Sequence, residues 1–153
     1  MHLYGHEVKP GERKTILLPV SSDISLEIVC CCGERSGKTL ILTSGVHGCE
    51  YVGVETLKRL SGTLEPKKLT GSVVFLPIAN PSGFFGAVKR VVPEDQINLN
   101  RAFPGKEEGS LSSRIAWVIE YALYPAADFL ADLHSGDGDE ALCPLVFFPT
   151  AGE

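Results

Sequence analysis

The feature that most constrains the fold is an apolar segment that ends in a glycine-containing turn and leads directly into a helical pattern. Residues 39–43 are typical of a buried β-strand, and residues 51–60 carry apolar side chains at helical spacing. The turn between them reads Gly45-Val46-His47-Gly48-Cys49-Glu50. Because glycine relaxes the backbone in such a turn, the side chains of His47 and Glu50 can converge on one point.

The rest of the chain alternates strand and helix patterns. Further strands are expected at residues 15–20, 26–32, 73–78 and 127–133, and a second helix between a cap at Ser110 or Ser112 and a stop at Pro125. Turn signals occur at residues 34–37 and 80–83, and a long loop with little periodicity spans residues 82–110. This alternation predicts one α/β domain over residues 1–153, with a mixed, mostly parallel sheet flanked by helices and an antiparallel N-terminal edge.

Charge and length argue against several kinds of partner. The 153 residues carry a net charge of −5 and no basic run, so neither nucleic acid nor an anionic membrane surface is an expected partner. The apolar stretches are much shorter than a membrane span. The N-terminus lacks the basic and apolar regions of a signal peptide, which predicts a cytoplasmic protein.

The five cysteines are interpreted mainly as apolar residues. Cys30, Cys31 and Cys32 alternate between the two faces of an expected strand, which favours small core residues of a reduced protein over metal ligands or a disulfide. Cys143 is expected to pack within its apolar run. Cys49 stands beside Glu50 and could be a soft ligand or an oxidisable thiol, but inert lining is the favoured interpretation.

A second isolated histidine also follows an apolar strand. His134 lies in Asp132-Leu133-His134-Ser135-Gly136, whereas His2 and His6 fall in an N-terminus expected to be mobile. Two histidines and one glutamate, with a fourth position open to water, are the ligands of hydrolytic zinc sites. A His-x-x-Glu pair alone is common by chance, as a loop histidine and a helix-start glutamate. Strand exits are where open α/β sheets bind ligands, which favours the metal interpretation.

The long loop supplies candidates for substrate binding. Asn100 and Arg101 are adjacent, and a guanidinium with a neighbouring amide can grip a carboxylate through several donors. Arg90 could face an oxygen that gains charge during a reaction. Two surface arginines are the alternative interpretation of the loop by itself.

Five motifs occur in order between Leu40 and Gly136 and together resemble one family. They are Gly45-Val46-His47-Gly48-Cys49-Glu50, Asn80-Pro81-Ser82-Gly83-Phe84, Arg90-Val91-Val92-Pro93-Glu94-Asp95, Asn98-Leu99-Asn100-Arg101-Ala102-Phe103-Pro104-Gly105 and Asp132-Leu133-His134-Ser135-Gly136. The chain thus resembles the succinylglutamate desuccinylase/aspartoacylase family, the deacylase branch of the zinc carboxypeptidase superfamily.

The resemblance implies both a fold and a chemistry. It implies a zinc-carboxypeptidase-like (phosphorylase/hydrolase-like) sheet between helices, and one Zn²⁺ per chain bound by His47, Glu50 and His134. It further implies hydrolysis of a small N-acyl amino acid by zinc-activated water. In that reaction Asn100 and Arg101 would hold the substrate carboxylate, and Arg90 would polarise the scissile carbonyl.

The sequence departs from the family pattern at two places. Asn98 occupies a position that is usually Asp, the carboxylate that accepts the N–H of the first histidine ligand, and the loss of charge predicts weaker zinc binding. The family's general base is a Glu from a later part of the chain. We therefore expect that the domain lacks its C-terminal part and that an uncovered sheet edge favours self-association.

Two other functions are also compatible with the sequence. A zinc carboxypeptidase acting on peptides is the alternative within the superfamily. A catalytically silent metal- or ligand-binding domain is the alternative of another class, because of Asn98 and the missing base.

Overall fold

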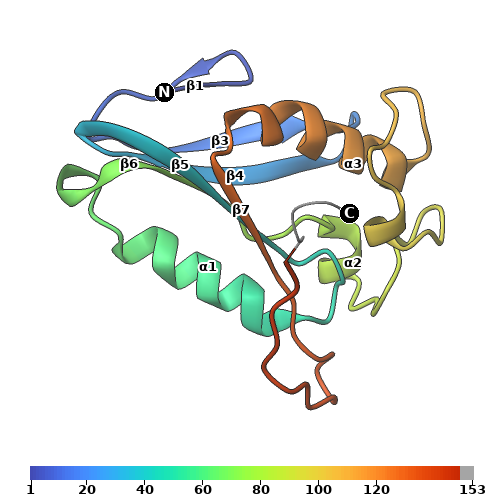
Figure 1. The fold of residues 1–153 in the computed structure, drawn as a ribbon. Coiled ribbons are helices and arrows are strands. Elements are labelled where there is room, and N and C mark those ends of the chain that lie inside the picture. The colour runs from blue at the N-terminus through green and yellow to red at the C-terminus, as the bar shows by residue number, and fades with distance from the viewer. Residues whose placement is uncertain (149–153) are drawn as a thin grey trace.

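A computed structural model describes residues 1–148, which are built around a five-stranded sheet (Figure 1). Its strands are β3 (Arg13–Pro19), β4 (Ser25–Cys32), β5 (Arg35–Ser44), β6 (Thr70–Leu76) and β7 (Phe129–Leu133), in the order β3-β4-β6-β5-β7. The α/β class and the mixed sheet are confirmed. The parallel majority is not, since β3/β4 and β4/β6 are antiparallel whereas β6/β5 and β5/β7 are parallel.

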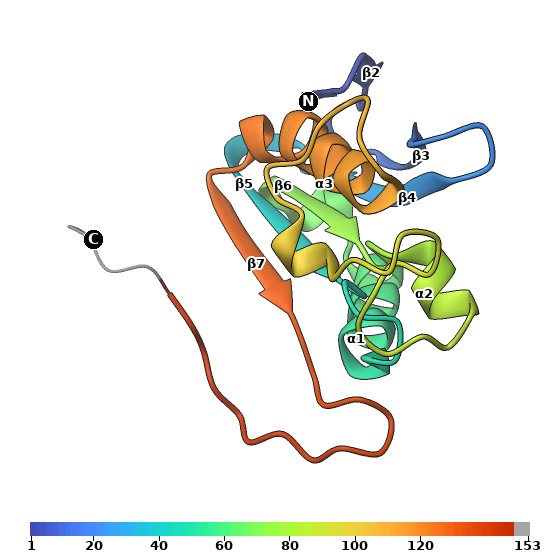
Figure 2. The same cartoon turned by 90° about the vertical axis from the view of Figure 1, so that its right-hand side faces the viewer.

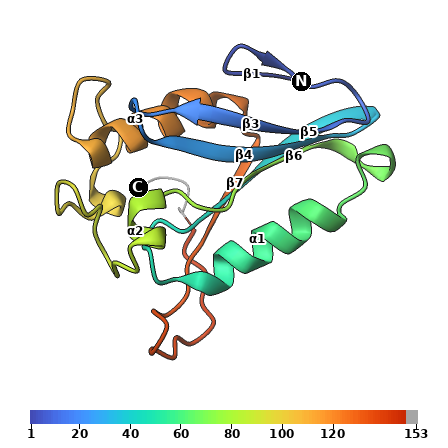
Figure 3. The ribbon, with the colours of Figure 1, turned by 180° about the vertical axis from the view of Figure 1, so that it is seen from behind.

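The two longest helices cover opposite faces of this sheet (Figures 1 and 3). Helix α1 (Tyr51–Thr63) lies on one face and α3 (Leu111–Ala122) on the other. The remaining elements are α2 (Pro81–Phe85), the hairpin β1 (His2–Leu3) and β2 (His6–Glu7), and the 3-10 turns η1 (Pro66–Lys68), η2 (Leu99–Arg101) and η3 (Tyr124–Ala126).

The core is divided between these two faces. The larger cluster joins α3 residues such as Ile115 to one face of the sheet and contains Cys30 and Cys32. The smaller cluster contains Cys31 together with Leu57 of α1. The predicted alternation of the three cysteines is therefore confirmed, and burial raises the pKa of the Cys30 thiol to about 12, as expected for an unreactive core residue.

Several local expectations were wrong. Residues 34–37 are not a turn, because β5 begins at Arg35, although its pairing with β6 shifts register before Thr39. The signal at residues 80–83 starts helix α2, since the Asn80 side chain accepts a hydrogen bond from Gly83 N at 3.0 Å and caps it.

The two ends of the described chain also differ from expectation. His2 and His6 belong to an antiparallel hairpin that the buried side chains of Leu3 and Val8 anchor to the core. Cys143 is exposed, because residues 141–148 run away from the sheet as an extended segment (Figure 2).

The edge strand β7 matters most for the site. It pairs with β5 along one side, and within residues 1–148 no strand pairs with its other side. Its side chains Phe129 and Leu130 are exposed. Self-association through this edge stays a prediction. Among the helices of the described chain, none is long and apolar enough to cross a membrane.

Candidate metal centre

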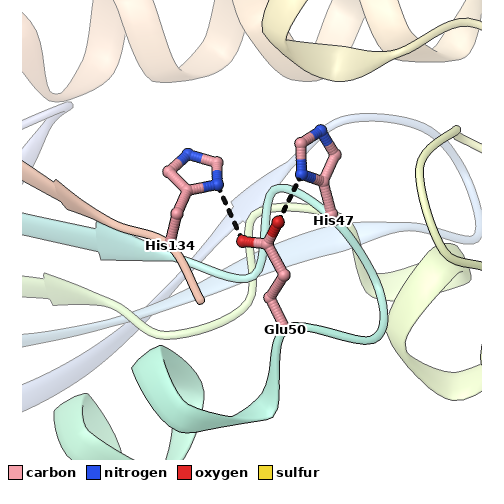
Figure 4. A group of neighbouring side chains, drawn as sticks. All are labelled: His47, Glu50 and His134. Carbon is pink, nitrogen blue, oxygen red and sulfur yellow. Dashed lines mark hydrogen bonds and ion pairs between the residues drawn. The ribbon is translucent and has the colours of Figure 1, made fainter. Parts of the chain in front are cut away.

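The sheet topology brings the two distant parts of the site together. His47 and Glu50 lie on the turn between β5 and α1, and His134 follows the last residue of β7. Strands β5 and β7 run parallel, with Ser44 opposite Leu133, so their carboxyl ends are adjacent. One potential ligand atom from each of His47, Glu50 and His134 lies within 4.8 Å of the others (Figure 4).

The turn that carries His47 and Glu50 is tightly packed. Gly45 has a φ of +66°, a left-handed conformation that glycine adopts readily. A Cβ atom at Gly48 would collide with the carbonyl oxygen of Gly83, so no other residue fits there without displacing the neighbouring loop. The buried amide of Asn80 donates to Val46 O at 3.3 Å and links the turn to α2. Close backbone packing therefore fixes the conformation of the turn that carries His47 and Glu50.

Both imidazoles present the same nitrogen to Glu50. His47 Nδ1 lies 2.7 Å from Oε1, and His134 Nδ1 lies 2.7 Å from Oε2 (Figure 4). The ring centroids are 5.3 Å apart, and Glu50 is buried. The two Nδ1 atoms and one carboxylate thus face a common point, the arrangement expected of three protein ligands around one cation.

The opposite nitrogen of each ring is bound by an acceptor. His47 Nε2 lies 3.1 Å from Asn98 Oδ1, and that oxygen also accepts the backbone N–H of Asn100 at 2.9 Å. Because a backbone N–H can only donate, the oxygen of the Asn98 amide faces the ring, and Nε2 of His47 carries a proton. A neutral His47 therefore has its lone pair on Nδ1, directed at Glu50.

His134 is oriented by a residue that the sequence interpretation missed. Asp132 Oδ2 accepts from His134 Nε2 at 2.7 Å, and Asp132 Oδ1 accepts from the hydroxyl of Thr43 at 2.6 Å. The signal was present, because residues two apart on a strand point to the same face, and Asp132 precedes His134 by two. One imidazole is therefore held by a carboxylate and the other by a neutral amide.

These contacts shift the ionisation of all three groups. Hydrogen bonds to Asp132 and Glu50 raise the pKa of His134 to about 10, and the hydrogen bond to Glu50 raises the pKa of His47. Burial by itself would raise the pKa of Glu50, but the hydrogen bonds from His134 and His47 lower it to about 2. In the absence of metal, protons therefore bridge the carboxylate and the imidazoles, and a bound cation would take their place.

The donor set fits a zinc ion chemically. Imidazole nitrogen and carboxylate oxygen are ordinary zinc ligands, and partners on the outer nitrogens of both rings fix the tautomer that such a metal needs. Within residues 1–148 the ligand cluster comprises only His47, Glu50 and His134. Cys49 is buried nearby and its sulfur lies 3.8 Å from the hydroxyl of Tyr51, but it is not part of the cluster.

The predicted substrate-binding residues lie in the long segment between α2 and α3. Asn98 links the segment that carries Asn100 and Arg101 to His47, and Arg101 is exposed, with Nη1 donating to the Asn100 carbonyl at 3.4 Å. Arg90 lies in the preceding loop, with Nη2 3.4 Å from Glu140 Oε1. Along the described chain none of these three forms a hydrogen bond or ion pair with a metal-ligand candidate, so their proposed roles require a substrate between them.

Fold and site together define an α/β protein in which His47, Glu50 and His134 form a cluster that could hold a metal ion, at the carboxyl ends of two parallel strands. The model of the succinylglutamate desuccinylase/aspartoacylase catalytic domain matches residues 36–152. The chain belongs to this family.

Individual relatives agree with this placement. The chain is 38% identical over 124 residues to an N-alpha-acetyl-L-2,4-diaminobutyric acid deacetylase of Halomonas elongata, covering 78% of this chain and 36% of that protein. An aspartoacylase family protein of Mesorhizobium loti superposes with a TM-score of 0.74 at 36% identity, over 88% of this chain and 43% of that one. The product-bound ectoine utilization protein EutE of Ruegeria pomeroyi superposes with a TM-score of 0.74 at 32% identity, over 84% and 41%.

The chain thus spans well under half the length of these relatives. The activities of those whole proteins are therefore hypotheses for this chain.

Proposed function

We propose that the protein is a zinc-dependent deacylase that hydrolyses the amide bond of an N-acyl amino acid. The observation that carries the proposal is the convergence of His47 Nδ1, His134 Nδ1 and the Glu50 carboxylate within 4.8 Å in a member of a deacylase family. A zinc ion held there would act as a Lewis acid and raise the acidity of a water molecule next to the scissile carbonyl.

Each residue around the centre has a separate role in the proposed reaction. Asn98 and Asp132 keep each imidazole in the tautomer whose Nδ1 lone pair faces the centre. Asn100 and Arg101 bind the free carboxylate of the substrate, which fixes the amide at the centre. Arg90 donates to the carbonyl oxygen as it gains negative charge. The general base is expected to be a glutamate and is not assigned to any residue of this chain.

Relatives suggest where to begin with substrates. A protein of 38% identity is named as a deacetylase of N-alpha-acetyl-L-2,4-diaminobutyric acid. We propose an Nα-acetyl amino acid as the first substrate to test, with the succinyl derivatives that the family name indicates as the second.

The test is hydrolysis by zinc-loaded protein, measured as release of the free amine from acetyl- and succinyl-amino acids. It is run on the 153-residue chain and on any longer product of the same gene. His134→Ala is the control, because it removes one ligand candidate from a partly exposed position. Release that requires zinc and is lost in the control supports a deacylase. Release from dipeptides alone supports a carboxypeptidase, and stoichiometric zinc without turnover supports the silent binding domain.

A further inference from the structure

Asp137 carries a buried carboxylate that has no role in the proposed reaction, and it lies next to Arg90, which does have a role. The side chain of Asp137 is 4% exposed, and its Oδ2 accepts no hydrogen bond from any residue of the described chain. Two cations approach this oxygen, Lys89 Nζ at 3.8 Å and Arg90 Nε at 3.9 Å. A buried, unpaired carboxylate is strongly unfavourable, so these cations are what offset its burial.

The backbone fixes Asp137 relative to the metal centre. The N–H of Glu140 donates to the Asp137 carbonyl at 2.8 Å and closes a turn over residues 137–140. This turn follows His134 through Ser135, whose N–H lies 3.3 Å from Glu50 Oε2. Asp137 is therefore tied to the segment that carries the third ligand candidate, whereas the Arg90 side chain is 67% exposed and needs a partner to define its orientation.

The two cations are not equivalent partners. Lys89 has a closer carboxylate of its own, Asp139, at 2.8 Å from Nζ. Arg90 has only the more distant Glu140, at 3.4 Å from Nη2, and that carboxylate is 48% exposed. Exposed pairs of this kind contribute little and exchange readily with water or a ligand. Lys89 is therefore divided between two carboxylates, whereas Asp137 is the only carboxylate of the described chain that approaches the Nε of Arg90.

We propose that Asp137 is a positioning residue that holds the Nε edge of the Arg90 guanidinium, so that its two terminal nitrogens face the substrate oxygen. The inference rests on the role of Arg90 in the proposed function. A movement of about 1 Å brings Nε and Oδ2 to the distance of a charge-assisted hydrogen bond. The Glu140 contact to Nη2 occupies the place of the substrate oxygen and is displaced when substrate binds.

The direct test is the hydrogen-exchange rate of the Arg90 Nε–H, measured by ¹⁵N NMR. In the wild-type protein it is expected to exchange more slowly than the Nε–H of the exposed Arg101. Asp137→Asn is expected to accelerate exchange at Arg90 about 10-fold, because it weakens the charge-assisted hydrogen bond that the movement of about 1 Å forms. Asp139→Asn is the matched control, since it removes a carboxylate of the same turn that pairs only with Lys89.

Equal exchange at Arg90 and Arg101 in the wild-type protein overturns the proposal without any variant, and so does an unchanged rate in Asp137→Asn. Kinetics give a second test if the protein is a deacylase. Asp137→Asn then lowers kcat and leaves KM unchanged, Asp137→Glu restores part of the loss, and Asp137→Asn adds nothing in an Arg90→Ala background. Independent losses in that double variant overturn the proposal. A wild-type protein without hydrolysis refutes the proposed function, while the exchange measurement still decides the role of Asp137.

Discussion

The two histidines of the centre differ in the charge of the acceptor behind them, and this difference predicts the effect of Asn98→Asp. His134 is held by the carboxylate of Asp132 at 2.7 Å, whereas His47 is held by the neutral amide of Asn98 at 3.1 Å. The substitution places a carboxylate behind His47 as well. It keeps the oxygen that accepts the Asn100 N–H, so the backbone of the loop is expected to keep its conformation.

The size of the effect follows from the type of hydrogen bond. A neutral hydrogen bond contributes about 1 kcal/mol and one to a charged group about 1.5–3 kcal/mol. The gain in ligand basicity at His47 is therefore about 1 kcal/mol. Since about 1.4 kcal/mol corresponds to a tenfold change in affinity, the dissociation constant for zinc is expected to fall roughly 5- to 10-fold.

The assay is competition for zinc between the protein and a chelator of known affinity at neutral pH. Asn100→Asp is the matched control, because it adds the same charge two residues away, whereas the observed contact of Asn100 in this network is through its backbone N–H. A gain in Asn98→Asp that greatly exceeds the gain in the control supports the account. An unchanged zinc affinity in Asn98→Asp, or equal gains in both variants, would show that the Asn98 side chain does not act on the metal through His47.

Three further predictions follow from the same site. Asp132→Asn is expected to weaken zinc binding about 10- to 100-fold in the same competition assay, and an unchanged affinity would contradict its role behind His134. Without metal, the lowered pKa of Glu50 (about 2, ordinarily 4.5) adds stability that is lost as the pH falls towards 2, and the raised pKa of His134 (about 10, ordinarily 6.5) adds stability that is lost as the pH rises through 10. In the presence of a chelator, the melting temperature should therefore be highest between pH 4.5 and 6.5. Because zinc competes with protons for the same side chains, the increase in melting temperature that zinc causes should become larger as the pH rises. An increase that does not grow with pH would contradict this prediction. In steady-state hydrolysis, Arg101→Ala should raise KM about 10- to 100-fold and Arg90→Ala should mainly lower kcat about 100- to 1,000-fold; the reverse pattern would mean that the two roles are exchanged.

The sequence predicted the convergence of the ligands because that convergence depends on topology. The strand before His47 and the strand before His134 are both visible as apolar runs, and parallel neighbours bring their carboxyl ends together. The pairing of Asn98 with His47 was predicted from the motif resemblance, and the structure places the two in contact.

What the sequence did not show depends on packing between segments far apart in the chain. The number of antiparallel pairings could not be read from apolar runs, because both kinds of strand have the same local pattern. Asp137, Asp139 and Glu140 look alike as a cluster of acidic residues, and only the fold reveals that Asp137 is buried against Arg90. Cys143 has an apolar run around it, yet nothing in residues 1–148 covers that run.

The measurement that tests the central claim most directly is anomalous diffraction at the zinc edge from crystals of zinc-loaded protein. The expected result is one peak per chain, within coordination distance of His47 Nδ1, His134 Nδ1 and the Glu50 carboxylate. Zinc bound elsewhere, for instance at a cysteine, or no peak between these three side chains at saturating zinc, would contradict it.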